Sequence, residues 1–244
     1  MSLLLLFISA IISSTISGVI GMGGGVLLLS LMTFFFPYQV IIPLHGVAQL
    51  ASNGMRSFYL KEHIIWSCFK PFIMGVPLGV AISYGLLSKV KSPHYFYLIL
   101  AIFIIYVIFK PKKLPEIKLK SKGWFFLGIA SGIQGPLLGA TGPLIAPFFR
   151  RSDISKEKIV ATKSALQIVT HLIKIPLFLS LSFNYAQYSL SLLILIFGVF
   201  LGTSLGVRYL KMISEQLFVL LFKGVLLIAA FRLFYKFLQG VGPF

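Results

Sequence analysis

Eight apolar runs recur along this chain of 244 residues, and each is long enough to form a membrane helix. The hydrocarbon core of a bilayer is about 30 Å thick, so a helix that crosses it needs about 20 apolar residues. Hydrophobic residues make up 58% of the sequence and charged residues 11%, which excludes an ordinary soluble domain. We therefore predict an all-α integral membrane protein. The predicted runs are Ser2–Phe36, Gln39–Tyr59, Ile64–Leu87, Pro93–Phe109, Trp124–Phe149, Ile159–Ser182, Ala186–Leu210 and Gln216–Phe237.

The chain is strongly basic, with 22 Lys and Arg residues against 5 Asp and Glu residues and a net charge of +17. In a soluble protein this balance would favour nucleic-acid binding. Here the basic residues fall in short clusters between apolar runs, such as Lys118–Lys122, and clusters of this kind indicate membrane topology. We expect the lipid bilayer as the surroundings of the chain and no nucleic acid as a partner.

The sequence lacks the short motifs that carry enzyme chemistry. It contains no Gly-x-Ser-x-Gly, no His-Glu-x-x-His, no Walker loop and no carboxylate pair. Its one cysteine, Cys68, excludes a disulfide framework and any multi-cysteine metal site. We therefore predict no enzyme activity, no cofactor and no metal.

The first and the fifth apolar runs are interrupted by glycine and proline, at Gly21–Gly25 and at Gly135–Pro143. Both residue types remove helix propensity and free backbone hydrogen-bonding groups. At membrane depth such groups are tolerated only where they are buried in protein or line a cavity. Each interrupted run is therefore predicted to be a broken or re-entrant helix pair.

The two interruptions belong to an internal duplication. Gly139 and Gly142 lie 118 residues after Gly21 and Gly24, and at this offset the polar residues of the following helices align as well. At 100° per residue, their spacing forms a stripe about 80° wide on one helix face. The aligned pairs are His45 with Lys163, Gln49 with Gln167, Ser52 with Thr170, Asn53 with His171, and Arg56 with Lys174. The predicted units are a first repeat over 1–110, a basic linker over 111–122 and a second repeat over 123–244.

The placement of basic residues predicts how the repeats are oriented. Arg56 and Lys61 follow the second run, whereas Arg150 and Arg151 precede its counterpart. By the positive-inside rule these two helices run in opposite directions. The prediction is a pair of inverted repeats, each a broken helix pair followed by three transmembrane helices, with the 110–122 loop cytoplasmic and both termini outside. Parallel repeats of four spans each are the competing scheme.

A half-helix that begins near Gly23–Gly25, and another near Thr141–Gly142, would present free N–H groups and positive dipole ends close to the bilayer midplane. Flanked by the two polar stripes, these ends are suited to a small oxyanion. The alternative is that the glycines only let helices pack closely. The predicted substrate-binding residues are Gly23, Gly24, Gly25, Gln49, Asn53, Thr141, Gly142, Lys163, Gln167, Thr170 and His171.

All acidic residues fall in loops or at the edges of runs, at Glu62, Glu116, Asp153, Glu157 and Glu215. A carboxylate proton relay inside the membrane is therefore not expected. If transport is proton-coupled, His45 or His171 would have to carry the proton, or the substrate would cross in a protonated form. Arg56 and Lys174 lie near predicted helix ends, and for these two side chains snorkelling to the membrane interface is expected.

The motif Gly-Val-Ile-Gly-Met-Gly-Gly-Gly at Gly18–Gly25, its degenerate copy at Gly135–Pro147 and the matched glycine pairs Gly75–Gly79 and Gly198–Gly202 resemble the sulfite exporter TauE/SafE family of membrane anion permeases. The resemblance implies transport of sulfite, sulfonates and related small anions across the cytoplasmic membrane. It also implies backbone donors to the substrate at Gly23, Gly24, Gly25 and Gly142.

Together these patterns predict a secondary transporter of small anions, with sulfite or a related sulfur oxyanion or organosulfonate as the leading substrate class. The anion would be held at half-helix N-termini near the midplane, and the two halves would rock to give alternating access. The alternatives are a passive anion channel, in which the same donors line a continuous pore, and a structural membrane protein that transports nothing. The oligomeric state is left open by the sequence.

Overall fold

The computed structural model describes residues 2–20, 23–89, 94–109, 116–149, 153–208 and 215–241. These residues form helices joined by short turns, and they contain no β-strand. Gly21 and Met22 of the first interruption, residue 110 and 111–115 of the basic linker, and Arg150 and Arg151 lie outside the described residues. The elements are α1 (Ser2–Ile20), α2 (Gly24–Met32), α3 (Tyr38–Tyr59), η1 (Lys61–His63), α4 (Trp66–Leu87), α5 (His94–Phe109), α6 (Ser121–Leu138), α7 (Gly142–Ile145), η2 (Ala146–Phe149), α8 (Lys156–Leu172), α9 (Lys174–Ser180), η3 (Tyr185–Tyr188), α10 (Ser189–Arg208) and α11 (Glu215–Val241).

Every predicted apolar run contains helix, and the outer surface of the bundle is apolar. Two of the described segments, Trp66–Leu87 and Tyr185–Gly206, are long and apolar enough to cross a bilayer by length and composition. Large apolar side chains on their outward faces are exposed, among them Met74 on α4 and Phe197 on α10. A surface of this kind fits a lipid environment better than water.

Both interruptions predicted from the sequence are breaks in the structure, and a glycine with positive φ lies at each. Gly23 precedes α2 with φ of 91°, and Gly139 ends α6 with φ of 80°. Only glycine adopts this backbone region without strain. The two returning helices differ in length, because α2 has 9 residues whereas α7 has 4 and continues as the 3-10 turn η2.

The matched glycine pairs bring helices of one half against the broken segment of the other half. A Cβ atom at Gly75 or Gly79 of α4 would lie 2.1 or 2.0 Å from a carbonyl oxygen of α6. A Cβ atom at Gly202 of α10 would lie 2.3 Å from the carbonyl oxygen of Ile11 in α1. The absence of side chains at these positions thus lets α4 pack on α6 and α10 pack on α1.

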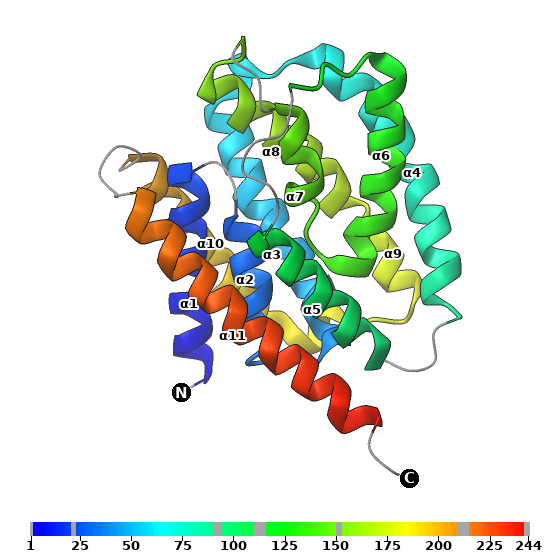
Figure 1. Ribbon diagram of the computed structural model, residues 1–244, viewed down its shortest axis with the longest axis vertical. Coiled ribbons are helices and arrows are strands. Elements are labelled where there is room, and N and C mark those ends of the chain that lie inside the picture. The colour runs from blue at the N-terminus through cyan, green and yellow to red at the C-terminus, as the bar shows by residue number, and fades with distance from the viewer. Residues whose placement is uncertain are drawn as a thin grey trace.

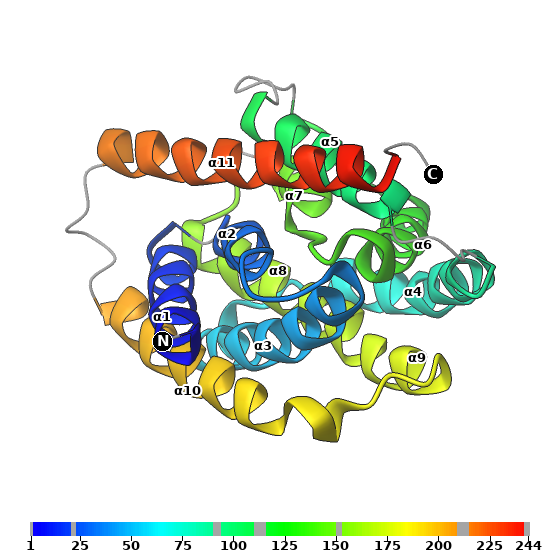
Figure 2. The same ribbon diagram turned by 90° about the horizontal axis from the view of Figure 1, so that it is seen from below.

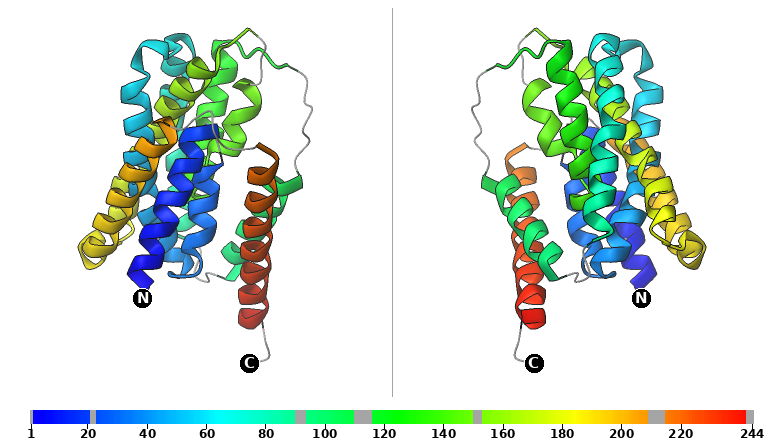
Figure 3. Two further views of the ribbon diagram at one scale, coloured as in Figure 1. Left: turned by 90° about the vertical axis from the view of Figure 1, so that its left-hand side faces the viewer. Right: turned by 90° about the vertical axis from the view of Figure 1, so that its right-hand side faces the viewer.

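The helices that carry the polar stripes, α3 and α8, pack on each other at the centre of the bundle, and α5 and α11 cross on one side of it (Figure 2). Figure 1 shows that α3 and α8 run in opposite senses. In Figure 3 both chain termini lie at one end of the molecule, and η1 and the start of α6 lie at the other. The chain turns back at the first break after rising from the terminal end, and at the second break after descending from the opposite end.

The sixth apolar run is divided into α8 and α9 at Ile173, whereas the run of apolar residues predicts one continuous helix. Pro176 explains it, because proline has no N–H to donate to the carbonyl of Leu172 and its ring crowds that carbonyl. The division places Lys174 at the first position of α9, directly below the polar stripe of α8.

Candidate functional site

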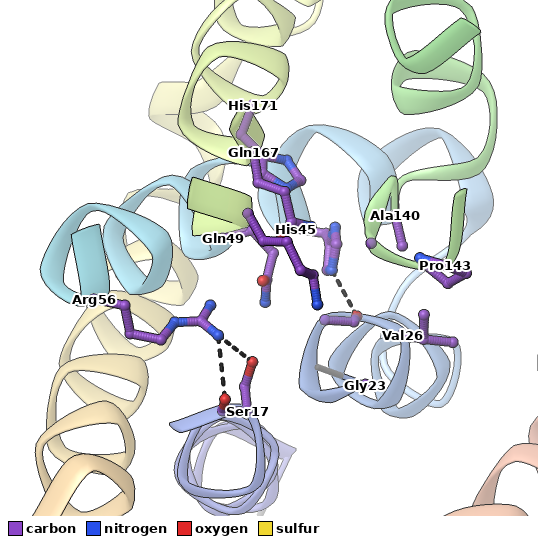
Figure 4. A pocket seen from close by; sticks show the side chains of 13 residues that line it. Ser17, Gly23, Val26, His45, Gln49, Arg56, Ala140, Pro143, Gln167 and His171 are labelled. Atoms are coloured by element: carbon purple, nitrogen blue, oxygen red, sulfur yellow. Dashed lines mark hydrogen bonds between the residues drawn. The ribbon is translucent and has the colours of Figure 1, made fainter. Parts of the chain in front are cut away.

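A buried pocket lies where the two breaks meet the polar stripes of α3 and α8 (Figure 4). Both halves of the sequence contribute side chains to it. Its lining residues are Ser17, Gly23, Gly25, Val26, His45, Gln49, Arg56, Ala140, Gly142, Pro143, Lys163, Gln167 and His171.

The pocket brings together most of the residues predicted from the sequence. The predicted residues that line it are Gly23, Gly25, His45, Gln49, Gly142, Lys163, Gln167 and His171. Those that lie outside its lining are Gly24, Asn53, Thr141 and Thr170. Five lining residues, Ser17, Val26, Arg56, Ala140 and Pro143, were not predicted as part of the site.

In each half a glutamine amide lies against a glycine in the first turn of the helix that follows the break. A Cβ atom at Gly25 would lie 3.1 Å from Oε1 of Gln49, and one at Gly142 would lie 3.3 Å from Nε2 of Gln167. Neither amide forms a hydrogen bond with another described residue. The two amides are thus free to bind a ligand, and they occupy equivalent places in the two halves.

Arg56 is buried beside the pocket, so the expectation that it snorkels to the membrane interface is wrong. Its guanidinium donates to the carbonyl of Ser17 at 3.3 Å and to the hydroxyl of Ser17 (Figure 4). It also donates to Oδ1 of Asn53 at 2.9 Å. Ser17 belongs to the last turn of α1, whose carbonyls have no partner within the helix. These acceptors hold the cation inside the protein, and every one of them is neutral.

Lys174 is also fully buried, and snorkelling is wrong for it as well. Its Nζ atom donates to the carbonyl of Gly139, which ends α6, at 2.6 Å and to Nδ1 of His171 at 3.2 Å. Arg56 and Lys174, which align in the duplication, therefore each bind a carbonyl at the end of the helix that precedes the break. Cations at helix C-termini interact favourably with the helix dipole.

The two histidines lie face to edge on one side of the pocket. Their ring centroids are 5.9 Å apart with an interplanar angle of 74°. Nε2 of His45 lies 2.8 Å from the carbonyl oxygen of Gly25. The remaining ring nitrogens, Nδ1 of His45 and Nε2 of His171, are buried and have no hydrogen bond of normal geometry.

The four predicted residues that lie outside the lining support those that line it. Asn53 donates to the backbone carbonyl of Gln49 at 2.8 Å while its Oδ1 accepts from Arg56. The hydroxyls of Thr141 and Thr170 lie 3.3 Å apart, which ties the second break to α8. Gly24 faces α1, where a Cβ atom would lie 2.1 Å from the carbonyl oxygen of Ser13.

The pocket carries positive charge, because Arg56 and Lys163 are among its lining residues and no Asp or Glu is. The described acidic side chains, those of Glu62, Glu116, Asp153 and Glu157, are all exposed. No group of three His, Cys, Asp or Glu side chains that could hold a metal ion occurs within the described ranges. The arrangement is suited to a small anion.

Helices that break at a buried, cationic pocket inside an apolar bundle define the class of membrane transporters with discontinuous helices. The model of one protein family, Sulfite exporter TauE/SafE, matches residues 6–233 of the chain. The protein therefore belongs to this family of membrane transporters, which is not an enzyme family, and the resemblance predicted from the glycine motifs is confirmed. Neither curated proteins nor solved structures gave a match.

Proposed function

We propose that this protein is a secondary transporter of small anions in the cell membrane, with sulfite, another sulfur oxyanion or an organosulfonate as its substrate. The observation that carries the proposal is the burial of Arg56, whose hydrogen-bond acceptors are all neutral, beside two uncommitted amides. A buried charge without a counter-charge costs several kcal/mol. A bound anion would offset that cost, because it supplies the missing negative charge.

The N-terminus of α2 adds backbone donors to this site. The first hydrogen bond of α2 is donated by the N–H of Leu27 to the carbonyl of Gly23, so the N–H groups of Gly24, Gly25 and Val26 precede the helical ladder. Such groups favour negative charge. The counterpart α7 has one turn only, and the second half is expected to bind the anion through the amide of Gln167 more than through a helix dipole.

Alternating access would arise from rocking of one half against the other around this pocket, as in transporters built from inverted repeats. The opposite senses of α3 and α8 support inverted repeats over 1–110 and 123–244 (Figure 1). In this scheme the 110–122 loop is cytoplasmic and both termini are outside. The crossed packing of α4 on α6 and of α10 on α1 would transmit motion between the halves.

The first test is binding of sulfite, sulfate, thiosulfate and methanesulfonate to the purified protein in detergent, measured as thermal stabilisation. A ligand that prefers the folded state raises its stability by RT ln(1 + [L]/Kd). We expect a selective and saturable shift for at least one of these anions. The absence of a shift with all of them would contradict the proposed substrate class.

Glutamine variants test whether the pocket is the binding site. Gln49→Ala and Gln167→Ala should each weaken anion binding and slow uptake into proteoliposomes, because each removes an uncommitted amide donor. Gln187→Ala, on the exposed turn η3, is the matched control and should behave as the parent does. Unchanged transport by both pocket variants would refute the site. Flux that does not saturate and shows no exchange with internal anion would favour the passive channel.

A further inference from the structure

The partners of the two pocket histidines determine which ring nitrogen of each carries a proton. Nε2 of His45 lies 2.8 Å from the carbonyl oxygen of Gly25, and a carbonyl only accepts hydrogen bonds. Nε2 of His45 is therefore protonated, and in the neutral ring Nδ1 is an acceptor. That Nδ1 is buried and makes no hydrogen bond of normal geometry, and the carbonyl of Gly139 also lies near the ring.

His171 has the opposite arrangement. Its Nδ1 lies 3.2 Å from Nζ of Lys174, which also donates to the carbonyl of Gly139, and an ammonium group only donates. Nδ1 of His171 is therefore an acceptor, and Nε2 carries the proton. This Nε2–H is buried without a partner. Two rings of the pocket lining, with centroids 5.9 Å apart, thus hold an unused donor on His171 and an unused acceptor on His45.

We infer that the anion binds together with one proton, which is held on Nδ1 of His45 while Nε2–H of His171 donates to the anion. The inference rests on the proposed function and adds to it a proton as the co-bound ion. A fully ionised oxyanion offers acceptors only, so the lone pair on Nδ1 would face it without a hydrogen bond. A proton taken from solvent converts this nitrogen into a charged donor, and a charge-assisted hydrogen bond forms. The proton returns to solvent when the anion leaves.

The charges around His45 couple the two binding events. The groups that surround it are Arg56 on its own helix, Lys163 and His171 on α8, and Lys174 on α9, while α2 contributes no titratable side chain. The helices α6 and α10 also pack on α3, and their basic residues, Lys122 and Arg208, lie at helix ends. In the empty pocket the cations oppose a further positive charge on His45. A bound anion removes that opposition, and by reciprocity the protonated ring strengthens anion binding.

Proton uptake on binding of methanesulfonate tests this inference. The purified protein would be titrated with this anion in weakly buffered detergent solution containing a pH indicator. The sulfonate does not itself titrate near neutral pH, so any proton bound must reside on the protein. We expect uptake of about one proton per anion bound, and an affinity that falls about tenfold for each unit of rising pH.

The matched variants are His45→Gln and His171→Gln. Glutamine at position 45 can still donate to the Gly25 carbonyl but has no titratable nitrogen, so proton uptake should be lost and the affinity should no longer depend on pH. Glutamine at position 171 retains an amide donor, and uptake should persist. If His45→Gln does not fold, the number of protons that the parent protein takes up per anion bound tests the inference instead.

Three outcomes would overturn the inference. Binding of methanesulfonate to the parent protein without proton uptake would overturn the inference, although the proposed anion site would remain supported. Uptake that persists in His45→Gln would place the proton elsewhere. Sulfite that binds when methanesulfonate and sulfate do not would mean that the ligand carries the proton itself. Failure of all the anions to bind would instead overturn the proposed function.

Discussion

At the scale of single residues, Arg56 determines the charge of the pocket. It is buried, all its hydrogen-bond partners are neutral, and it lies beside the amide of Gln49 in the lining. Its partner Ser17 comes from α1, 39 residues earlier in the chain. The cation is therefore held by the break of the first half, and its charge faces the space that an anion would enter.

We predict that Arg56→Gln weakens anion binding by at least about tenfold, or about 1.4 kcal/mol. The reason is the loss of a buried charge whose attraction for an anion is poorly screened. Lys70→Gln removes the same charge from an exposed position on α4 and serves as the control. The comparison is made by ligand-dependent thermal shift, and equal affinities for the two variants would contradict the role given to Arg56.

Two neighbouring glycines at the first break should differ in the effect of an added methyl group. Gly25→Ala places Cβ 3.1 Å from the amide oxygen of Gln49, a flexible side chain that can give way, so the protein should fold and bind anions less tightly. Gly24→Ala places Cβ 2.1 Å from the backbone oxygen of Ser13, which cannot move alone. The thermal midpoint of Gly24→Ala should therefore fall by more than that of Gly25→Ala. A larger midpoint loss for Gly25→Ala would contradict the assignment.

At the scale of helices, close glycine contacts join α4 to α6, and the same contacts recur between α10 and α1. We predict that Gly79→Ala destabilises the protein by about 1–3 kcal/mol, the usual cost of overpacking. Its Cβ atom would lie 2.0 Å from the carbonyl oxygen of Ile129.

Gly85 on the same helix provides the control, because nothing lies within 4 Å of its Cβ position. Gly85→Ala should leave the thermal midpoint unchanged or raise it slightly, since alanine is the better helix former. Unfolding in detergent, followed by circular dichroism, measures both variants. Equal midpoints for the two would indicate that α4 and α6 do not depend on close contact.

At the scale of the whole molecule, the ends of the bundle carry different connections. The end with η1 and the start of α6 lies opposite the end with both termini (Figure 3). By the positive-inside rule, the end that holds Lys61, Lys118 and Lys120 should face the cytoplasm. The proposed inverted repeats require this assignment.

Single cysteines introduced into a Cys68→Ala background test the topology. Ser88→Cys follows α4, and Lys120→Cys precedes α6, and both positions are exposed. A membrane-impermeant thiol reagent should label Ser88→Cys in intact cells and Lys120→Cys only after permeabilisation. Labelling of both from the same side would refute the proposed arrangement, and the reverse pattern would invert its orientation.

The sequence by itself determined the all-helical class, the two breaks and the paired glutamines. These features follow from local composition and from a residue spacing that recurs in the two halves, and neither property depends on tertiary contacts. Gly23 and Gly139 break the helices where the glycine-rich motifs predicted breaks. Gln49 and Gln167 line one pocket because an amphipathic stripe fixes the helix face on which its residues lie.

Only the tertiary structure decided which polar residues face the pocket and which hold the others in place. Arg56 and Lys174 lie near helix ends, where sequence predicts snorkelling, but in the folded chain the carbonyls of Ser17 and Gly139 lie within hydrogen-bond reach. Gly24 packs against α1 while Gly25 faces Gln49. The physical reason is that burial depends on which helix lies opposite, and that helix comes from a distant part of the chain.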